Sequence, residues 1–363
     1  MKNKDICALG LMSGTSADGL TLCFFDISAK KVLAYKTYPY DKKLQQKILN
    51  AKDLKAPQIS ELNFELARLY AQKALKFIKD FNINKKNICV IGSHGQTIFH
   101  SPKATIPNTL QIGEGCFLAH AFKGTAVVYN FRPADIAVGG SGAPLVPVFD
   151  KFICGSKKTM LLNIGGISNI TVCSGKKYYG FDIGPGNSLS DSAVSILTNG
   201  QKTYDKNGEL AAACSPDIKK AEELSKLFIG KKPPVSLDRS SFSNDFIKKF
   251  FKNISLKDIS TLNYLTALII TKSIKFFILN REKLKTLHLC GGGVYNKTLV
   301  KNIAALLPQI QVLSTEALGL PPLAKEAAAF AYLAWLTLNG KTGNCRSATG
   351  AKENAVLGCI IKQ

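Results

Sequence analysis

Two stretches of the same form decide the fold: Ile6-Cys-Ala-Leu-Gly-Leu-Met-Ser-Gly-Thr-Ser-Ala-Asp-Gly-Leu-Thr-Leu-Cys-Phe-Phe-Asp-Ile27 and Met160-Leu-Leu-Asn-Ile-Gly-Gly-Ile-Ser-Asn-Ile-Thr-Val-Cys173. Each joins two apolar runs through a turn of small and polar residues, which predicts a β-hairpin. A third apolar run follows each hairpin, at Val32–Tyr38 and at Tyr178–Ile183. The repetition indicates a duplicated α/β fold with two lobes and a central cleft.

Helical and extended patterns fill the rest of each half. The length of 363 residues is enough for two domains. We expect an N-terminal lobe formed by residues 1–135 with about 336–363, and a C-terminal lobe formed by residues 136–335. Helices are expected from Ser60, from Asn187, and at Leu262–Leu279, Leu299–Leu307 and Ala324–Leu338. Another is expected from Ser215-Pro216-Asp217 to Gly230, with Ser215 as its cap. Further strands are expected at Ile88–Ile91 and Thr286–Cys290.

Composition excludes several classes of protein. With 46% hydrophobic and 20% charged residues, the chain is globular rather than disordered. Its most apolar helix is interrupted by Lys272 and Lys275, and the N-terminus lacks a signal sequence, so we expect no membrane partner. The 10 cysteines are dispersed without a CxxC pair, which favours free thiols and a cytoplasmic location.

The net charge of +23 comes mainly from lysine. The lysines are scattered along the chain, arginine is scarce, and basic residues do not alternate with aromatic ones as they do in nucleic-acid sites. We therefore expect a solvated basic surface, which would attract small anions, and no nucleic-acid partner.

Two glycine-rich turns are suited to phosphate. Ser13-Gly-Thr-Ser-Ala-Asp-Gly19 combines backbone and hydroxyl donors with a carboxylate, Asp18, that can hold a hydrated metal; the alternative is an ordinary polar turn. Gly291-Gly-Gly293 follows a strand and precedes a helix, where phosphate or a flat ring can approach; the alternative is close helix–strand packing. Neither turn matches GxxxxGK[ST] or GxGxxG.

Asp182 is the best candidate for a catalytic acid or base. It ends an apolar strand, where α/β sheets place ligands, and apolar neighbours would tend to raise its pKa. Asn187 is expected to cap the next helix. Arg132 can hold a carboxylate or pair with Asp135, and His94 by itself is more often structural. Metalloprotease, serine-hydrolase and protein-kinase motifs are absent from the sequence.

Motifs along the whole chain, in order, resemble the anhydro-N-acetylmuramic acid kinase family. They are Gly10-Leu-Met-Ser-Gly-Thr-Ser-Ala-Asp-Gly19, Gly92-Ser-His-Gly-Gln-Thr97, Thr109-Leu-Gln-Ile-Gly113, Gly139-Gly-Ser-Gly-Ala-Pro-Leu-Val-Pro147, Leu162-Asn-Ile-Gly-Gly-Ile-Ser-Asn-Ile-Thr171, Phe181-Asp-Ile-Gly-Pro-Gly-Asn187, Cys290-Gly-Gly-Gly-Val-Tyr-Asn296 and Ala324-Lys-Glu-Ala-Ala-Ala-Phe330. The resemblance implies the two-lobed, ribonuclease H-like fold of the actin, hexokinase and acetate-kinase superfamily, and a homodimer.

The resemblance also implies a reaction and residue roles. The family converts 1,6-anhydro-N-acetylmuramic acid, ATP and water into N-acetylmuramic acid 6-phosphate and ADP during peptidoglycan recycling. Asp182 would be the general base, and Asp18 would hold Mg²⁺ through water. Sugar contacts would come from Arg132, Glu326, His94 and Gln96. The ATP contacts would be Gly14, Thr15, Ser16, Ala17, Asp18, Gly19, Leu20, Thr21, Gly165, Gly166, Gly291, Gly292, Gly293 and Asn296.

Three departures from the family pattern leave alternatives open. Thr21 replaces an acidic residue, Ile183 replaces a threonine, and Pro233–Ser240, with Asp238, differs from the usual Pro-Pro-Lys-Ser-Thr-Gly-Arg-Glu. A catalytically weak sugar-binding or regulatory protein on this scaffold is one alternative. A kinase for another amino sugar, or for an acid such as acetate, is the other.

Overall fold

The computed structural model describes residues 6–228, 242 and 244–363. The chain forms two compact units, one of Met1–Ile153 with Gly319–Gln363 and the other of Cys154–Leu318. These boundaries differ from the expected ones at 135/136 and 335/336. The later boundary shifts because helix α12 (Lys325–Leu338) packs on strands of the first unit. The earlier one shifts because Leu145 and Phe149 belong to the same core as α12.

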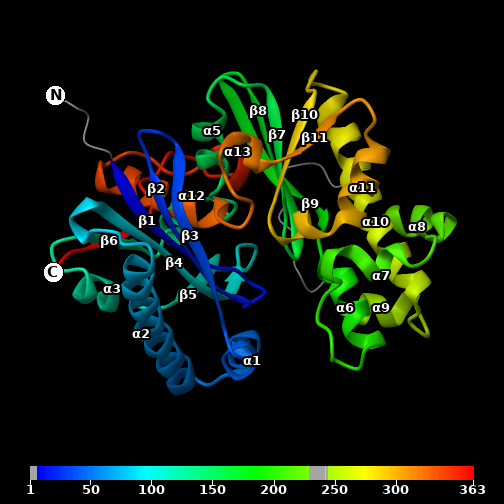
Figure 1. Ribbon diagram of the computed structural model, residues 1–363. Coiled ribbons are helices and arrows are strands. Elements are labelled where there is room, and N and C mark those ends of the chain that lie inside the picture. The colour runs from blue at the N-terminus through cyan, green and yellow to red at the C-terminus, as the bar shows by residue number, and fades with distance from the viewer. Residues whose placement is uncertain (1–5, 229–241, 243) are drawn as a thin grey trace. The chain divides into compact units, whose positions relative to one another are not determined.

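The first unit is built on one mixed sheet with the order β12-β6-β4-β1-β2-β3, to which β5 adds beside β4 (Figure 1). Strands β1, β2 and β3 form an antiparallel meander, whereas β4 and β6 run parallel to β1. The strands are β1 (Cys7–Ser13), β2 (Gly19–Asp26), β3 (Lys31–Pro39), β4 (Ile88–Ser101), β5 (Asn108–Ile112), β6 (Ala126–Tyr129) and β12 (Cys359–Ile361).

The second unit repeats this plan. Its sheet has the order β11-β10-β7-β8-β9, again with an antiparallel meander followed by two parallel strands. The strands are β7 (Thr159–Ile164), β8 (Ile167–Ser174), β9 (Lys177–Pro185), β10 (Thr286–Cys290) and β11 (Gln311–Ser314). The shared strand order confirms the predicted duplicated, actin-like α/β fold.

Helices cover these sheets. The first unit has α1 (Lys42–Leu49), α2 (Ala56–Asp80), α3 (Cys116–Ala121), α4 (Arg132–Ala137), α5 (Pro147–Cys154), α12 and α13 (Arg346–Thr349). The second has α6 (Ser188–Leu197), α7 (Glu209–Ala212), α8 (Ile218–Ser225), α9 (Asn244–Phe250), α10 (Leu256–Ile274) and α11 (Lys297–Leu306). Short helical turns include η3 (Lys206–Gly208), η5 (Lys275–Leu279) and η6 (Gly292–Tyr295).

Two elements of the first unit are longer than expected. Helix α2 begins at Ala56 rather than Ser60, because Pro57 lies in its first turn and the side chain of Gln58 accepts a hydrogen bond from the Lys55 N–H (2.9 Å). Strand β4 continues past Ile91 to Ser101, because its second half pairs with β5. The polar segment from Ser93 to Thr97 therefore lies within strand β4 rather than in a loop.

Alternation along β1 places its side chains on both faces of the sheet. Leu9 and Leu11 pack in the core under α2, whereas Ala8 packs in the core under α12. Helix α12 approaches very closely, because a side chain at Gly10 would collide with the backbone of Ala327 and one at Gly92 with the carbonyl of Phe330. Gly10 and Gly92 are partners in the β1–β4 register. These glycines allow α12, with its first turn, to lie directly on the sheet.

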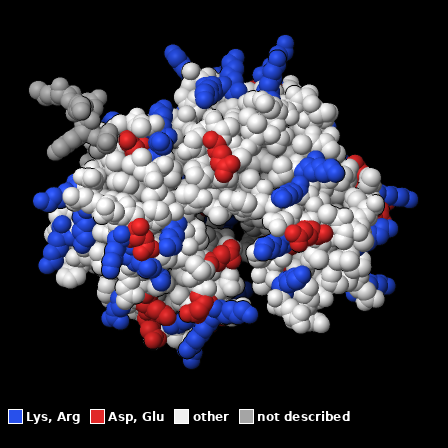
Figure 2. Space-filling view, in the orientation of Figure 1, with Lys and Arg blue, Asp and Glu red and all other residues white. Residues whose placement is uncertain are grey.

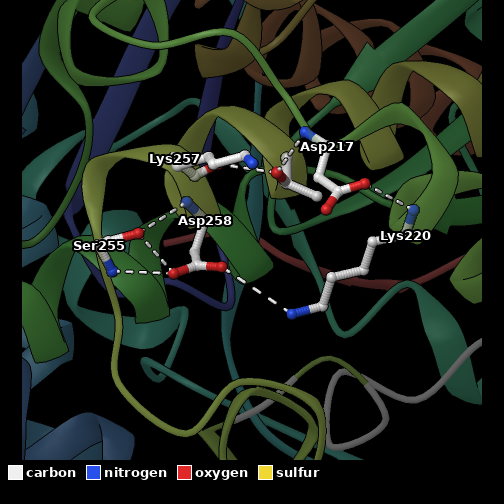
Figure 3. A network of polar contacts seen from close by, with 6 residues as sticks. Asp217, Lys220, Ser255, Lys257 and Asp258 are labelled. Atoms are coloured by element: carbon white, nitrogen blue, oxygen red, sulfur yellow. Dashed lines mark hydrogen bonds and ion pairs between the residues drawn. The ribbon is translucent and has the colours of Figure 1, made fainter.

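Helix caps in the second unit set the start of α8 and α10 (Figure 3). Asp217, rather than the expected Ser215, caps α8, and its carboxylate accepts from the Lys220 N–H at 3.0 Å. The Asp217 N–H in turn donates to the Thr261 hydroxyl of α10 at 2.9 Å. Ser255 and Asp258 form a reciprocal capping box at the start of α10. The two helix starts are thus tied to each other.

The segment Leu256–Leu279 is long and apolar enough to cross a membrane by length and composition, but 72% of its most apolar window is buried inside the unit. Its side chains contribute to two cores, one against the sheet and one against α6, α8 and α9. This segment is therefore the central core helix of the second unit. The expected helix end at Gly230 and the departure at Pro233–Ser240, with Asp238, lie outside the described residues.

Candidate active site

The turn between β1 and β2 is a compact backbone loop. The Ala17 N–H donates to the Gly14 carbonyl at 3.1 Å, and Ala17 has a φ of +53° with its side chain buried. A side chain at Gly14 would meet only the Ser16 hydroxyl, at 3.8 Å, so packing does not require glycine there. Thr15 and Asp18 are exposed, whereas Gly19 and Leu20 are buried. The open side of the turn is its first half, where an anion can reach the backbone.

A buried polar network supports this turn from below. Tyr40 donates to the Ser13 hydroxyl at 2.9 Å, and Ser13 donates to the Gln96 side-chain oxygen at 2.5 Å. The Gln96 amide nitrogen donates to the Gly14 carbonyl at 3.1 Å. Because Gln96 is 0% exposed and both ends of its amide are bonded, it lies beneath the turn rather than where a sugar would reach it.

Asp18 projects from the turn into solvent. Its carboxylate accepts from the Gln45 side chain at 3.2 Å, and the same amide reaches the Ser16 carbonyl at 3.4 Å. Mg²⁺ in nucleotide sites keeps several waters and needs only one or two carboxylates besides the phosphates. An exposed carboxylate beside an open backbone turn fits this requirement. Among the described residues, groups of three or more His, Cys, Asp or Glu that could form an all-protein metal cage are absent.

A second cluster of the first unit centres on Arg132, at the start of α4. The His94 Nδ1 lies 2.9 Å from the Gly95 carbonyl, so Nδ1 carries the proton and Nε2 accepts. Arg132 donates to this Nε2 from Nε at 3.2 Å and from Nη2 at 3.1 Å. Burial and the charge of Arg132 lower the pKa of His94 to about 3, which keeps the imidazole neutral. His94 therefore holds the guanidinium of Arg132 in place.

Glu326 of α12 provides the charge that opposes Arg132. Burial lowers the pKa of Arg132 to about 10, and Glu326 acts in the opposite direction. Asp135 is not the partner of Arg132: it is 0% exposed, and its carboxylate accepts from Gly142 N–H (2.8 Å), Asn344 (3.0 Å) and Thr349 (2.9 Å). Asp135 thus shapes the loop after α4, and Arg132 keeps donors that can bind a carboxylate.

In the second unit, Asp182 belongs to a polar row that crosses three strands. Asn163 of β7 pairs with Asn169 of β8, and Asn169 pairs with Asp182 of β9. Directly opposite residues point to the same face of a sheet, so the three side chains lie side by side. They occupy the face away from α10 and α11, since the neighbouring Leu162, Ile170 and Phe181 pack under those helices. All three polar residues are half-buried.

A β-bulge adjusts the end of this row. The register passes from Ser168–Gly184 to Asn169–Asp182, so Ile183 is the extra residue on β9. Its carbonyl accepts from the Ser273 hydroxyl of α10 at 3.3 Å, and its side chain is buried in the core. The isoleucine that departs from the family pattern therefore faces the core. The bulge sets the direction of Asp182, which lies within β9 because that strand continues to Pro185 rather than ending near Asp182 as expected.

The glycine turns of the second unit divide into tight and open positions. Side chains at Gly291 and Gly293 would collide with Ile164, and Gly291 also has a φ of +80°. By contrast, nothing lies closer than 3.6 Å to a side chain placed at Gly165 or closer than 4.0 Å to one at Gly292. Close packing thus explains two of the glycines, and a ligand can approach at Gly165 and Gly292.

Two asparagines adjoin these turns. Asn187 lies at the start of α6 but makes no side-chain capping bond, contrary to expectation; its amide lies beside Gly292 and Gly293. Asn296 does cap a helix, because its oxygen accepts from the Leu299 N–H at 2.9 Å and from Asn263 at 3.1 Å. Only the amide nitrogen of Asn296 is left for a nucleotide. Gly166 is tied to α6 by the hydroxyl of Ser188.

Comparison with known proteins places these motifs in one family. The family model described as anhydro-N-acetylmuramic acid kinase matches residues 7–363. The chain belongs to the anhydro-N-acetylmuramic acid kinase family. Relatives named anhydro-N-acetylmuramic acid kinase from Caldanaerobacter subterraneus subsp. tengcongensis and Francisella tularensis subsp. novicida are each 38% identical over 97% of this chain, covering 96% and 97% of their own lengths.

The activator of the 2-hydroxyisocaproyl-CoA dehydratase from Clostridium difficile, solved with bound ADPNP, is a structural neighbour with 11% identity and a TM-score of 0.46. The match covers 92% of this chain and 96% of that one. The relatives of this anhydro-N-acetylmuramic acid kinase family member are named as kinases, which supports the predicted phosphotransferase and does not favour the alternative of a sugar-binding or regulatory protein.

Several site features escaped the sequence. Asn169 and Asn163 lie beside Asp182 only because of strand pairing, and Tyr40 reaches Ser13 from beyond β3. From the alternation of residues along β8, the sequence could have predicted that Asn169 lies on a polar face. It could not have predicted that Asn169 lies opposite Asp182, because that depends on strand register. Thr21, which departs from the family pattern, bonds through its hydroxyl to the Thr37 hydroxyl (2.9 Å) across β2 and β3.

Proposed function

We propose that this chain opens the 1,6-anhydro ring of 1,6-anhydro-N-acetylmuramic acid with water and transfers the γ-phosphoryl group of ATP to O6. The products would be N-acetylmuramic acid 6-phosphate and ADP. The observation that carries the proposal is the family match over residues 7–363, joined to a carboxylate, Asp182, set beside a bulge in β9 in a row with two amides. Sequence identity and local geometry thus point to the same chemistry.

Asp182 acts in this proposal as the general base. It takes a proton from the water that attacks the anomeric carbon, and the bond between that carbon and O6 breaks. The oxygen released from the anhydro bridge then attacks the γ-phosphorus, and ADP leaves. The amides of Asn169 and Asn163 are placed to orient the carboxylate and the attacking water.

The glycine turns bind the nucleotide in this proposal. Gly14, Gly165 and Gly292 have room for phosphate or base to reach the backbone. Asp18 would hold Mg²⁺ through water, and the ion, when bound, supplies positive charge to the transferring phosphoryl group. Ser13, Tyr40 and Gln96 keep the first turn in shape.

Recognition of the sugar is assigned to the Arg132 cluster. The guanidinium suits the carboxylate of the lactyl group, and Glu326 suits a sugar hydroxyl donor. Lys and Arg side chains are spread over the face seen in Figure 2, with acidic ones between them, which fits general attraction of anions better than a nucleic-acid track. A cytoplasmic homodimer without nucleic-acid or membrane partners completes the proposal.

The test is a product analysis in ¹⁸O-water. Purified protein is incubated with ATP, Mg²⁺ and 1,6-anhydro-N-acetylmuramic acid, and the products are identified by mass spectrometry. We expect a phosphorylated N-acetylmuramic acid with the label at its anomeric oxygen. A panel of other amino sugars and acetate, assayed for ADP release, is run in parallel. Turnover of one of these with none of the anhydro sugar would overturn the substrate assignment.

A further inference from the structure

A buried ion pair joins helix α5 to the start of helix α12. The Lys325 ammonium is 2.8 Å from the Asp150 carboxylate, and the two side chains are 2% and 1% exposed. Lys325 is the first residue of α12, and Asp150 lies in α5. Both elements belong to the first unit.

Stability is a poor explanation for this pair. Removing two charges from water costs several kcal/mol per ion, and apolar replacements of buried pairs are often neutral or stabilising. A cation in the first turn of a helix also opposes the helix dipole. Lys325 carries both penalties, because it is buried and begins α12. Such a pair is therefore weak evidence for stability, and a positioning role is the alternative.

The residue next to Lys325 is Glu326, the proposed sugar contact. The charged groups that act on Glu326 come from three helices: Lys325 from α12, Arg132 from α4 and Asp150 from α5. His94 of β4, which bonds to Arg132, is kept neutral by burial and by the Arg132 charge, which lower its pKa to about 3. The ion pair therefore acts on the same carboxylate as Arg132.

We propose that the Lys325–Asp150 ion pair is a positioning device: by joining α5 to the first turn of α12, it holds the neighbouring Glu326 in place for sugar binding. This inference rests on the proposed function, since it takes Glu326 as a sugar contact. Lys325 and Asp150 act through Glu326 and do not themselves touch the substrate.

The direction of the electrostatic effect follows from the neighbours. Burial raises the pKa of Glu326, Lys325 and then Arg132 lower it, and Asp150 raises it to a smaller extent. Lys325 lowers the pKa of Glu326 more than Asp150 raises it, so neutralising both residues removes a net lowering effect. The pKa of Glu326 then rises, and the carboxylate is lost at a higher pH than in the wild-type protein.

The experiment compares the pH dependence of the binding constant (1/Kd) for the anhydro sugar in the absence of ATP, so that ionisation of the general base Asp182 does not set the acidic limb through turnover. The main variant combines Lys325→Met with Asp150→Asn, so that no unpaired buried charge is left. We expect its acidic limb to move to higher pH, with weaker sugar binding at acidic pH and recovery at alkaline pH. KM for ATP should stay unchanged, because the nucleotide turns are separate elements.

A matched control removes a surface pair of the same unit. Lys47→Met with Glu65→Gln deletes the exposed pair at 2.6 Å, and its profile should coincide with that of the wild type. Lys325→Arg, which keeps the cation, provides a second variant in case the neutral one fails to fold. Its acidic limb should stay at the wild-type pH.

The outcomes separate the two proposals. Absence of product from folded wild-type protein would overturn the proposed function. With an active wild type, a folded neutral variant whose acidic limb does not move would overturn the positioning role alone. A shifted limb in Lys325→Arg would also overturn it, because the charge is retained there.

Discussion

At the scale of single residues, Asp182 gains its setting from strand pairing rather than from its immediate neighbours in sequence. The bulge at Ile183 and the cross-strand partner Asn169 determine where its carboxylate points. We expect Asp182→Asn to fold and bind ATP normally but to lose turnover by about 10²–10⁴-fold, the usual contribution of a general base. Steady-state kinetics and ATP titration measure this.

The control for this substitution is Glu222→Gln, a carboxylate-to-amide change at an ion pair between α8 and α10. Its kcat should match the wild type. Near-normal turnover in Asp182→Asn would remove Asp182 from the role of base.

Gly14 offers a second prediction at this scale. A methyl group there meets only the Ser16 hydroxyl, at 3.8 Å, so Gly14→Ala should change the free energy of unfolding by no more than about 0.5 kcal/mol. The same methyl group would occupy the space through which phosphate reaches the turn, so KM for ATP should rise about tenfold or more. An unchanged KM in the variant would argue that phosphate approaches elsewhere.

At the scale of elements, the contact between α12 and the first sheet depends on glycine. Gly10→Ala places a methyl group against the Ala327 backbone, which cannot move without shifting α12. We expect a loss of about 1–3 kcal/mol in unfolding free energy, the cost of overpacking a tight core. Urea denaturation measures it, with Gly14→Ala as the matched change in open space. Equal stability of the two variants would contradict this account.

The start of α8 gives a second prediction for an element. Asp217→Ala removes the carboxylate that caps the helix and should cost about 1 kcal/mol. Ser215→Ala, two positions earlier and exposed, should have almost no effect. Thermal denaturation of the two variants measures the difference, and a larger loss for Ser215→Ala would restore the cap expected from the sequence.

At the scale of the whole molecule, buried neutral histidines link stability to pH. His94 has its pKa lowered from 6.5 to about 3 by burial and by Arg132. Below pH 6.5 the unfolded chain therefore binds a proton that the folded chain does not, and stability falls as the pH falls from 6.5 towards 3. The contribution of His94 is about 1.4 kcal/mol per pH unit.

His94→Gln keeps an acceptor for Arg132 and removes this titration. As the pH is lowered from 6.5 to 4, we expect the free energy of unfolding to fall less steeply in this variant than in the wild type. The difference in slope should be about 1.4 kcal/mol per pH unit, which corresponds to one proton. His120→Gln, at an exposed position of α3, is the matched control. A slope in His94→Gln equal to that of the wild type would show that His94 is protonated in the folded chain.

Much of this architecture is local enough to be predicted from sequence. The two hairpins, the strand Thr286–Cys290 and the last core helix follow from apolar runs and turn residues that act over a few positions. The family motifs are also contiguous, so Asp182, Gly14 and Arg132 stand out without a structure. Helix and strand ends were less accurate where a distant partner decides them, as for β4, which β5 extends.

The chain alone thus determined the duplicated α/β plan, the family and the list of candidate residues, because each is written in short stretches of sequence. Only tertiary structure decided which candidates are open and which are buried or bonded to other residues. Asn169 meets Asp182 through strand register, Gln96 turns beneath the first turn to bond Ser13, and Lys325 finds Asp150 across two helices. These pairings join residues far apart in sequence, and their energies come from burial and hydrogen bonds that exist only after the chain has folded.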